Sequence, residues 1–195
     1  MQNTKPLYTL QEIEDSILSP GSKEHFSKLF KLSLIPKGRI ILDIGQVSST
    51  LYIIRKGIMR AYYIKGSKDI TSWLVSDGDI ACIAESFFYK TESNEAMEAL
   101  EDTWVYAISF EAYQQLITED NSMARVAIRL LQDHLIHFSD RIRLFKCLGV
   151  EERITAYINQ PSSLFRKIPD HYIATYLGTT SATFSRCLKK ILYDK

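Results

Sequence analysis

The sequence lacks features that define several large classes of protein. No run of apolar residues approaches the roughly 18 that cross a bilayer as a helix, so we expect no membrane span. Residues 1–15 contain no apolar segment of the kind found in secretory signals, which predicts a cytoplasmic protein. The 3 cysteines, at positions 82, 147 and 187, are widely separated, which predicts reduced thiols and no metal site.

Motifs of catalysis are equally scarce. Residues 36–110 contain no histidine, so the ligands that a cupin-like metal enzyme needs on its strands are missing. No Gly-rich phosphate loop, nucleophile elbow or Cys/His dyad is present. We therefore expect no enzyme activity, no catalytic residue, no metal ligand and no cofactor.

The charges nearly cancel, but they are unevenly distributed. The whole chain carries a net charge of +1. Residues 141–195 hold 10 Lys and Arg against 4 Asp and Glu, whereas residues 1–140 hold 14 against 19. A basic segment behind an acidic body is typical of a protein that attaches to nucleic acid through one end. The alternative is a solvated basic surface on an ordinary small helical domain.

Residues 168–191 have the pattern of two short helices joined by a tight turn. Pro169 and Asp170 suit the start of a helix, and Gly178 can adopt the left-handed conformation that ends one. Hydroxyl side chains then precede a second helix. The apolar faces of the two helices are Ile173, Ala174 and Leu177, and Phe184, Leu188 and Ile191. This pattern predicts a helix-turn-helix, whose second helix enters the major groove of double-stranded DNA.

The middle of the chain has the period of β-strands. Short β-branched and aromatic runs alternate with turn residues, and we expect strands at residues 39–43, 51–55, 58–64, 70–75, 96–100 and 103–109. Their regular spacing predicts an all-β barrel or double-sheet jelly roll. Helices are expected before it, at residues 10–18 and 23–34, and after it, at residues 110–117.

A long helix is predicted from residue 122 to residue 148. Its apolar residues recur at alternating spacings of 4 and 3, which is the heptad pattern of two helices that wind together. We expect a parallel homodimer with the interface Ile128, Leu131, Leu135, Phe138, Ile142 and Phe145. The alternative is a helix packed only on its own domain. Gly149 is a predicted hinge, and the expected domains are residues 1–121, 122–148 and 149–195.

The order of these parts resembles the Crp/Fnr family of bacterial transcription regulators. The resemblance covers residues 26–190 and is carried by the segments IPKG at 35–38, IRKGIMR at 54–60, GDI at 78–80, EERI at 151–154 and IATYLGTTSATFSR at 173–186. It implies an α+β fold: a cyclic-nucleotide-binding-like jelly roll, a dimerisation helix and a helical helix-turn-helix domain. The chain looks most like the short members typical of Bacteroidetes-type bacteria, which end soon after the recognition helix, so we expect a reduced or absent wing.

The resemblance also implies a ligand pocket in the β-domain. Glu85 stands where cyclic-nucleotide-binding members have a ribose-binding glutamate, but the phosphate-binding pair falls on Ser93 and Asn94. No arginine lies between Arg60 and Arg125, so a cyclic phosphate would lack its bidentate partner, and we expect weak or no binding of cyclic AMP. The predicted pocket residues are Glu85, Ser86, Ser93, Asn94, Phe138 and Ser139. The effector is unknown: either another small molecule binds there or regulation lies elsewhere.

In the recognition helix, Arg186 matches a family arginine that reaches toward a base edge, and we expect it to contact guanine. Thr179, Thr180, Lys189 and Lys190 are expected to contact phosphates. The complete set of predicted DNA-binding residues is Thr179, Thr180, Ser181, Thr183, Arg186, Lys189 and Lys190. The expected function is therefore a homodimeric DNA-binding transcription regulator, with RNA polymerase as a candidate partner. The alternative is a degenerate regulator that acts through protein contacts without specific DNA binding.

Overall fold

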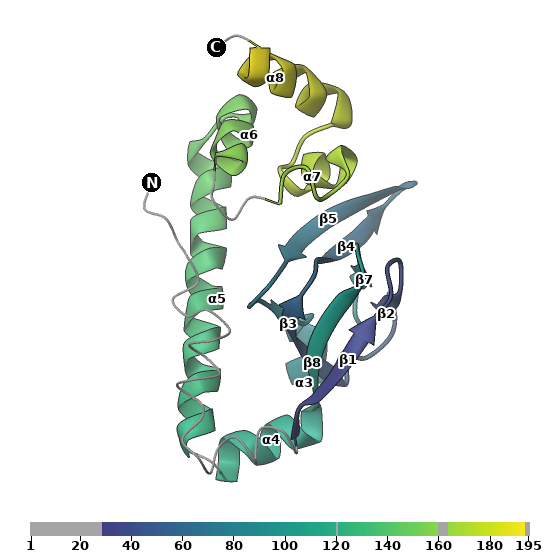
Figure 1. The fold of residues 1–195 in the computed structure, drawn as a ribbon, viewed down its shortest axis with the longest axis vertical. Coiled ribbons are helices and arrows are strands. Elements are labelled where there is room, and N and C mark those ends of the chain that lie inside the picture. Colours follow the sequence, from purple (N-terminus) through teal and green to yellow (C-terminus); the bar gives the residue numbers. More distant parts are fainter. Residues whose placement is uncertain (1–28, 120, 160–163, 194–195) are drawn as a thin grey trace.

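The computed structural model describes residues 29–119, 121–159 and 164–193 (Figure 1). A β-domain lies beside one long helix, and a group of shorter helices covers the end of both. This arrangement confirms the predicted α+β fold. The helix predicted at residues 10–18 lies outside the described residues.

Two four-stranded antiparallel sheets make up the β-domain. One has the order β1-β8-β3-β6 and the other β2-β7-β4-β5. Apolar side chains such as Ile54, Met59 and Val105, all fully buried, fill the space between them. The strands are β1 (Lys31–Ile35), β2 (Ile40–Leu42), β3 (Thr50–Lys56), β4 (Met59–Lys65), β5 (Lys68–Val75), β6 (Ile80–Ala81), β7 (Ala96–Ala99) and β8 (Thr103–Ser109).

The predicted helix at residues 23–34 is wrong for its last four residues. Lys31–Ile35 is strand β1, which pairs with β8 from Lys31 opposite Ala107 to Ile35 opposite Thr103. Polar Lys31 and Ser33 alternate with Leu32 and Leu34, which is the period of a strand. The segment forms a strand instead of a helix because β8 is available to pair with it.

The helices match the sequence pattern closely. In the described part of the chain the first two are α3 (Ala84–Tyr89) and α4 (Phe110–Glu119), and α4 leads into the long α5 (Asn121–Cys147). The C-terminal group is α6 (Val150–Ile158), α7 (Asp170–Tyr176) and α8 (Ser181–Tyr193). Pro169 caps the start of α7, and α8 begins after a turn at Gly178, so both predicted helices of the helix-turn-helix are present.

The C-terminal helices share a core with the β-domain. Ile154, Ile173 and Phe184 are completely buried, and Ile58 of the β3–β4 turn belongs to the same cluster. Leu74 and Leu100 of the β-domain pack against it. The helix-turn-helix is therefore seated on the β-domain of its own chain.

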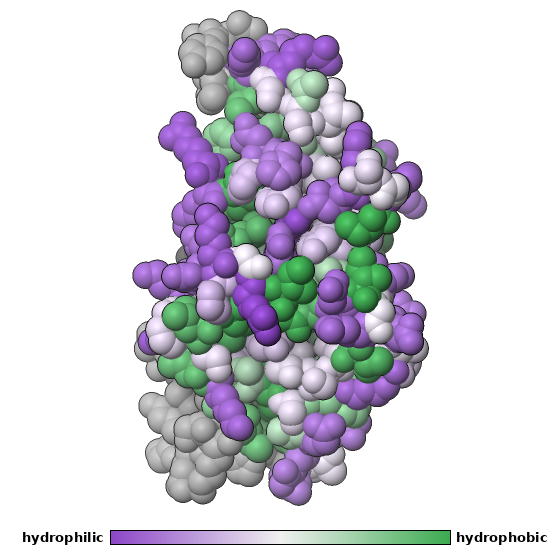
Figure 2. Space-filling model, turned by 90° about the vertical axis from the view of Figure 1, so that its right-hand side faces the viewer, coloured by the Kyte–Doolittle hydropathy of each residue, from purple (hydrophilic) through white to green (hydrophobic). Residues whose placement is uncertain are grey.

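On the face turned away from α5, hydrophobic residues form separate patches among hydrophilic ones (Figure 2). None of the helices in the described ranges combines the length and apolarity that a bilayer crossing requires.

Candidate DNA interface and sensor site

The turn between α7 and α8 requires glycine at position 178. Gly178 has a φ of +69°, and its N–H donates to the carbonyl of Thr175 at 3.0 Å. The N–H of Thr179 reaches back to the carbonyl of Ala174 at 2.9 Å, which completes a Schellman C-cap. A Cβ at position 178 would also lie 2.7 Å from Cε1 of Phe145. The turn thus brings α8 into a fixed relation with both α7 and the end of α5.

Thr180 caps the N-terminus of α8. Its Oγ1 accepts a hydrogen bond from the Thr183 N–H at 3.2 Å and donates to the Thr183 hydroxyl at 3.1 Å. Two of the predicted DNA contacts therefore also have a structural task. Thr179 is half-buried beneath the turn, which leaves it less open than Thr180.

The outer face of α8 is open to solvent at the end of the molecule farthest from the β-domain (Figure 1). Phe184 is completely buried, and Cys187, Leu188 and Ile191 are packed beside it. The exposed side chains of the opposite face are Ser181, Ala182, Ser185, Arg186 and Lys189. Two exposed cations and small side chains at a helix N-terminus make a surface that fits a groove lined with phosphates.

Lys190, another predicted DNA contact, forms an ion pair within the protein. Its Nζ lies 2.7 Å from Oε1 of Glu151 on α6, and both side chains are at least half exposed. An ion pair this exposed contributes about 0–1 kcal/mol. The ion pair links α8 to α6, and Lys190 would lose little free energy by leaving Glu151 to contact a phosphate.

Two arginines that were not predicted from the sequence, Arg141 and Arg153, donate hydrogen bonds to the C-terminal end of α7. The buried Arg153 donates through Nε to the carbonyl of Leu177 at 3.1 Å and through Nη1 to that of Leu148 at 2.9 Å. Arg141 of α5 donates to the carbonyl of Tyr176 at 3.0 Å. They satisfy carbonyls at the C-terminus of α7 that would otherwise lack partners. Arg153 lies in the EERI motif, which was a usable signal.

The predicted hinge residue, Gly149, stands at the N-terminus of α6. Its φ of −68° and ψ of 169° are open to any residue, and its N–H donates to Oε2 of Glu152 at 2.7 Å. Glycine is not required for the conformation seen, so a hinge at Gly149 stays a prediction.

The predicted dimer stripe of α5 is exposed along its length. Leu135 is 68% exposed and Ile128 55%, although both are large apolar residues on a packed helix. Phe138 and Phe145 also contact their own chain, because Phe138 stacks on Trp73 of β5 and Phe145 touches Gly178. The most exposed members of the stripe are Leu135, Ile128 and Phe138, at 68%, 55% and 50%, and Ile142 and Leu131 follow at 45% and 43%.

Two of the six predicted pocket residues, Ser86 and Ser93, are engaged in internal hydrogen bonds. Buried Ser86 accepts from the Ser48 N–H at 2.8 Å and donates to the Thr91 carbonyl at 2.7 Å. Buried Ser93 donates to the carbonyl of Glu95 at 2.6 Å and accepts from its N–H at 3.1 Å. These two hydroxyls shape the loop after α3. Glu85, Asn94 and Ser139 are exposed.

The cations near this loop are also engaged. Nζ of Lys90 donates to the Ser48 carbonyl at 3.2 Å and lies 3.4 Å from the centroid of the Phe110 ring. The buried arginines of the described chain, Arg60 and Arg153, lie outside the space between the sheets. Burial raises the pKa of the Cys82 thiol to about 12, so it stays protonated near neutral pH. The described residues contain no cluster of three or more His, Cys, Asp or Glu that suits a metal.

Comparisons with known proteins agree with this geometry. Residues 33–120 match the cyclic nucleotide-binding domain family. The chain is 28% identical over 167 residues to the fumarate and nitrate reduction regulatory protein of Escherichia coli (strain K12), covering 79% of this chain and 66% of that protein. That is slightly less than two thirds of the relative's length.

Solved structures share the fold. FixK2 from Bradyrhizobium japonicum aligns with a TM-score of 0.71 at 19% identity, covering 85% of this chain and 86% of that one. A putative transcriptional regulator of the Crp/Fnr family from Eubacterium rectale aligns with a TM-score of 0.68 at 20% identity, covering 99% and 89%. The match to the cyclic nucleotide-binding domain, the similarity to the fumarate and nitrate reduction regulatory protein and the shared fold together support a regulator of the Crp/Fnr type.

Proposed function

We propose that this protein is a homodimeric regulator that binds specific sites on double-stranded DNA. The observation that carries the proposal is α8, whose apolar side is buried while Arg186 and Lys189 stand exposed beside small residues. Similarity to the fumarate and nitrate reduction regulatory protein and to a Crp/Fnr-type structure supports the assignment to a transcription regulator of that type. A regulator of this kind acts in the cytoplasm, and RNA polymerase is its expected partner.

The stripe of α5 supports the dimer. Five apolar side chains of the stripe, Ile128, Leu131, Leu135, Phe138 and Ile142, are each more than 40% exposed, which is unusual in a soluble monomer and typical of a helix that packs on a second copy. Two-fold symmetry would present two copies of α8 to successive major grooves. Recognition would then require a two-fold symmetric operator.

The effector of this regulator is proposed not to be cyclic AMP. The hydroxyls of Ser86 and Ser93 already have partners, and the ammonium of Lys90 lies against Ser48 and Phe110. A cyclic phosphate would have to displace these bonds without gaining a guanidinium fork. Glu85 and Asn94 remain available to a ligand of different chemistry.

Selection of genomic fragments by the purified protein tests the function. We expect enrichment of a two-fold symmetric site of about 20 base pairs, since half-sites lie about one to two helical turns apart. Arg186→Ala should lose the enrichment, and Arg55→Ala, which removes an exposed arginine from β3, serves as the matched control. Salt-sensitive binding without enrichment would contradict sequence-specific recognition, and absence of binding at low salt would favour the regulator that acts through protein contacts.

A further inference from the structure

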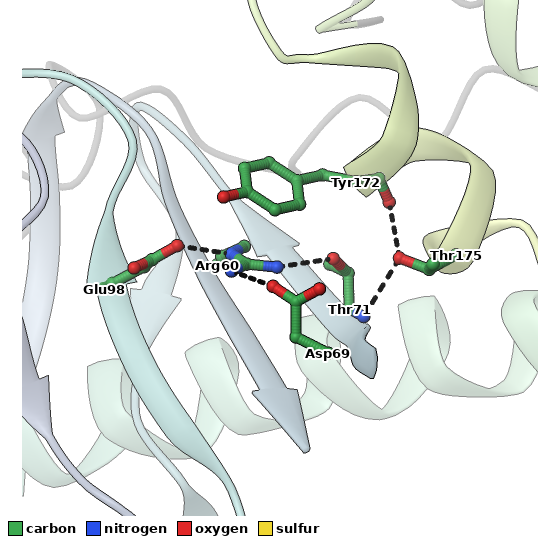
Figure 3. A network of polar contacts seen from close by, with 6 residues as sticks. All are labelled: Arg60, Asp69, Thr71, Glu98, Tyr172 and Thr175. Carbon is green, nitrogen blue, oxygen red and sulfur yellow. Dashed lines mark hydrogen bonds and ion pairs between the residues drawn. The ribbon is translucent and has the colours of Figure 1, made fainter. Parts of the chain in front are cut away.

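A buried arginine lies where the helix-turn-helix meets the β-domain. Arg60 of β4 is 2% exposed, with Nε 2.6 Å from Oε1 of Glu98 on β7 and Nη2 2.5 Å from Oδ2 of Asp69 on β5 (Figure 3). Its Nη1 donates to Oγ1 of Thr71 at 3.3 Å. The guanidinium of Arg60 on β4 thus links β5 and β7 through its ion pairs with Asp69 and Glu98.

Helix α7 covers this cluster. The centroid of the Tyr172 ring lies 3.5 Å from Cζ of Arg60, which is a close cation–π contact (Figure 3). Beside it, the N–H of Thr71 donates to Oγ1 of Thr175 at 3.1 Å, and that hydroxyl donates to the carbonyl of Tyr172 at 3.1 Å. The first helix of the helix-turn-helix therefore meets the β-domain through a specific polar contact as well as through apolar packing.

The local form of β5 explains why the contact falls there. β5 is an edge strand, so the N–H groups on its outer side have no neighbouring strand. Ala61 pairs with Trp73 and Tyr62 with Thr71, so Ser72 is the extra residue of a β-bulge. On one side of this bulge Thr71 meets α7. On the other side the Trp73 ring lies 5.3 Å from that of His134 on α5.

We infer that Arg60, with Tyr172 and Thr175, is a positioning contact that fixes the DNA-binding helices relative to the β-domain and the dimer helix. Domains joined by one short connection move relative to each other unless their interface restrains them. A hydrogen bond, including one within an ion pair, restrains the relative orientation of two domains as well as their distance, because it weakens steeply as the donor–hydrogen–acceptor angle departs from linearity. A fixed α8 loses less freedom on binding DNA, so the contact should strengthen binding. This last step rests on the proposed function.

Variants on α7 test the inference without disturbing the charges of the β-domain. Arg60→Gln would leave two carboxylates without their cation, and that change alone destabilises a folded domain. Tyr172→Leu removes the ring over Arg60, and Thr175→Val removes the acceptor for the Thr71 N–H while keeping the shape. Tyr89→Leu, at a tyrosine that is 79% exposed, and Thr118→Val, on α4, are the matched controls.

Hydrogen exchange of the full-length protein is the first measurement. We expect the amide of Thr71 to exchange about 5- to 10-fold faster in Thr175→Val, the effect of one lost hydrogen bond. Amides of α7 should exchange faster in Tyr172→Leu, and both controls should match the wild type. Exchange that stays at wild-type rates in both α7 variants would overturn the positioning role.

Binding to the selected DNA site is the second measurement. We expect both α7 variants to bind about 3- to 10-fold more weakly with an unchanged salt dependence, because no phosphate contact is lost. Faster exchange with wild-type DNA affinity would overturn the inference, since α7 would then be loosened without effect on α8. Wild-type protein that binds no DNA contradicts the proposed function, whereas the exchange rates report on the α7 contact independently.

Discussion

The predicted ligand pocket and the predicted DNA surface use their polar side chains in opposite ways. In the β-domain, Ser86 and Ser93 are buried and bonded within the chain, and Lys90 lies against Phe110. On α8, Arg186 and Lys189 are exposed along a helix whose other side is packed. This difference is the basis for proposing that the chain binds DNA through α8 and does not bind a cyclic nucleotide in the β-domain.

The largest effect is expected at the dimer stripe, where the open surface has no partner in the described chain. Leu135→Asp places two charges in the proposed interface. It also removes two leucine side chains that the dimer would bury, each of which contributes about 1.5–3 kcal/mol. The dissociation constant of the dimer should rise by at least about 100-fold. Sedimentation equilibrium measures it, with Gln114→Asp, at an exposed position of α4 outside the stripe, as the control. An unchanged dimer would assign association to another surface.

The next effect concerns base recognition by α8. Arg186→Ala should weaken binding to the selected site by about 1–3 kcal/mol and relax specificity at one base pair of each half-site. Fluorescence anisotropy with the selected site and with single-base variants measures both quantities. If affinity falls equally on every sequence, Arg186 contacts phosphate instead of a base.

The turn before α8 gives a sharper comparison of two glycines. Gly178→Ala and Gly66→Ala impose the same left-handed strain of about 1–3 kcal/mol, since their φ values are +69° and +64°. The added Cβ meets Phe145 at position 178, whereas nothing lies within 4 Å at position 66. Thermal unfolding should therefore show the larger loss for Gly178→Ala. Equal losses would mean that Phe145 moves aside freely.

The smallest expected effects test the sensor side. Ser93→Ala should lower the free energy of unfolding by about 1 kcal/mol in the absence of any ligand, because its hydroxyl bonds to Glu95. Millimolar cyclic AMP should leave the unfolding temperature of the wild type unchanged. If cyclic AMP raises the unfolding temperature of the wild type but not that of Ser93→Ala, the β-domain binds the nucleotide at Ser93 and the account of the sensor side is wrong.

Much of the fold was readable because apolar spacing reports which face is buried. The stripe Ile173, Ala174 and Leu177, the residue Phe184 and the left-handed Gly178 were all predicted and are found as expected. Strand β1 was missed, because Leu29, Phe30 and Leu34 also fit a helical period and its partner lies about 70 residues away. Pairing across such a distance leaves no mark in a local pattern.

The sites were harder to predict than the elements. The sequence shows that Ser86 carries a hydroxyl, but folding of the chain is what brings its partners Ser48 and Thr91 to it. The sequence near Arg60 gives no sign of its role, because its partners Asp69, Glu98 and Tyr172 lie farther along the chain and meet it only in the folded protein. Side chains that act across domains depend on tertiary contacts, and these are what the structure adds.

The central claim is that two chains joined along α5 read one operator with two copies of α8. Native mass spectrometry of the protein with the selected duplex measures this stoichiometry directly. We predict two chains on each duplex, and for Leu135→Asp a loss of that complex at the same protein concentration. A single chain bound per duplex with unchanged affinity would contradict the claim.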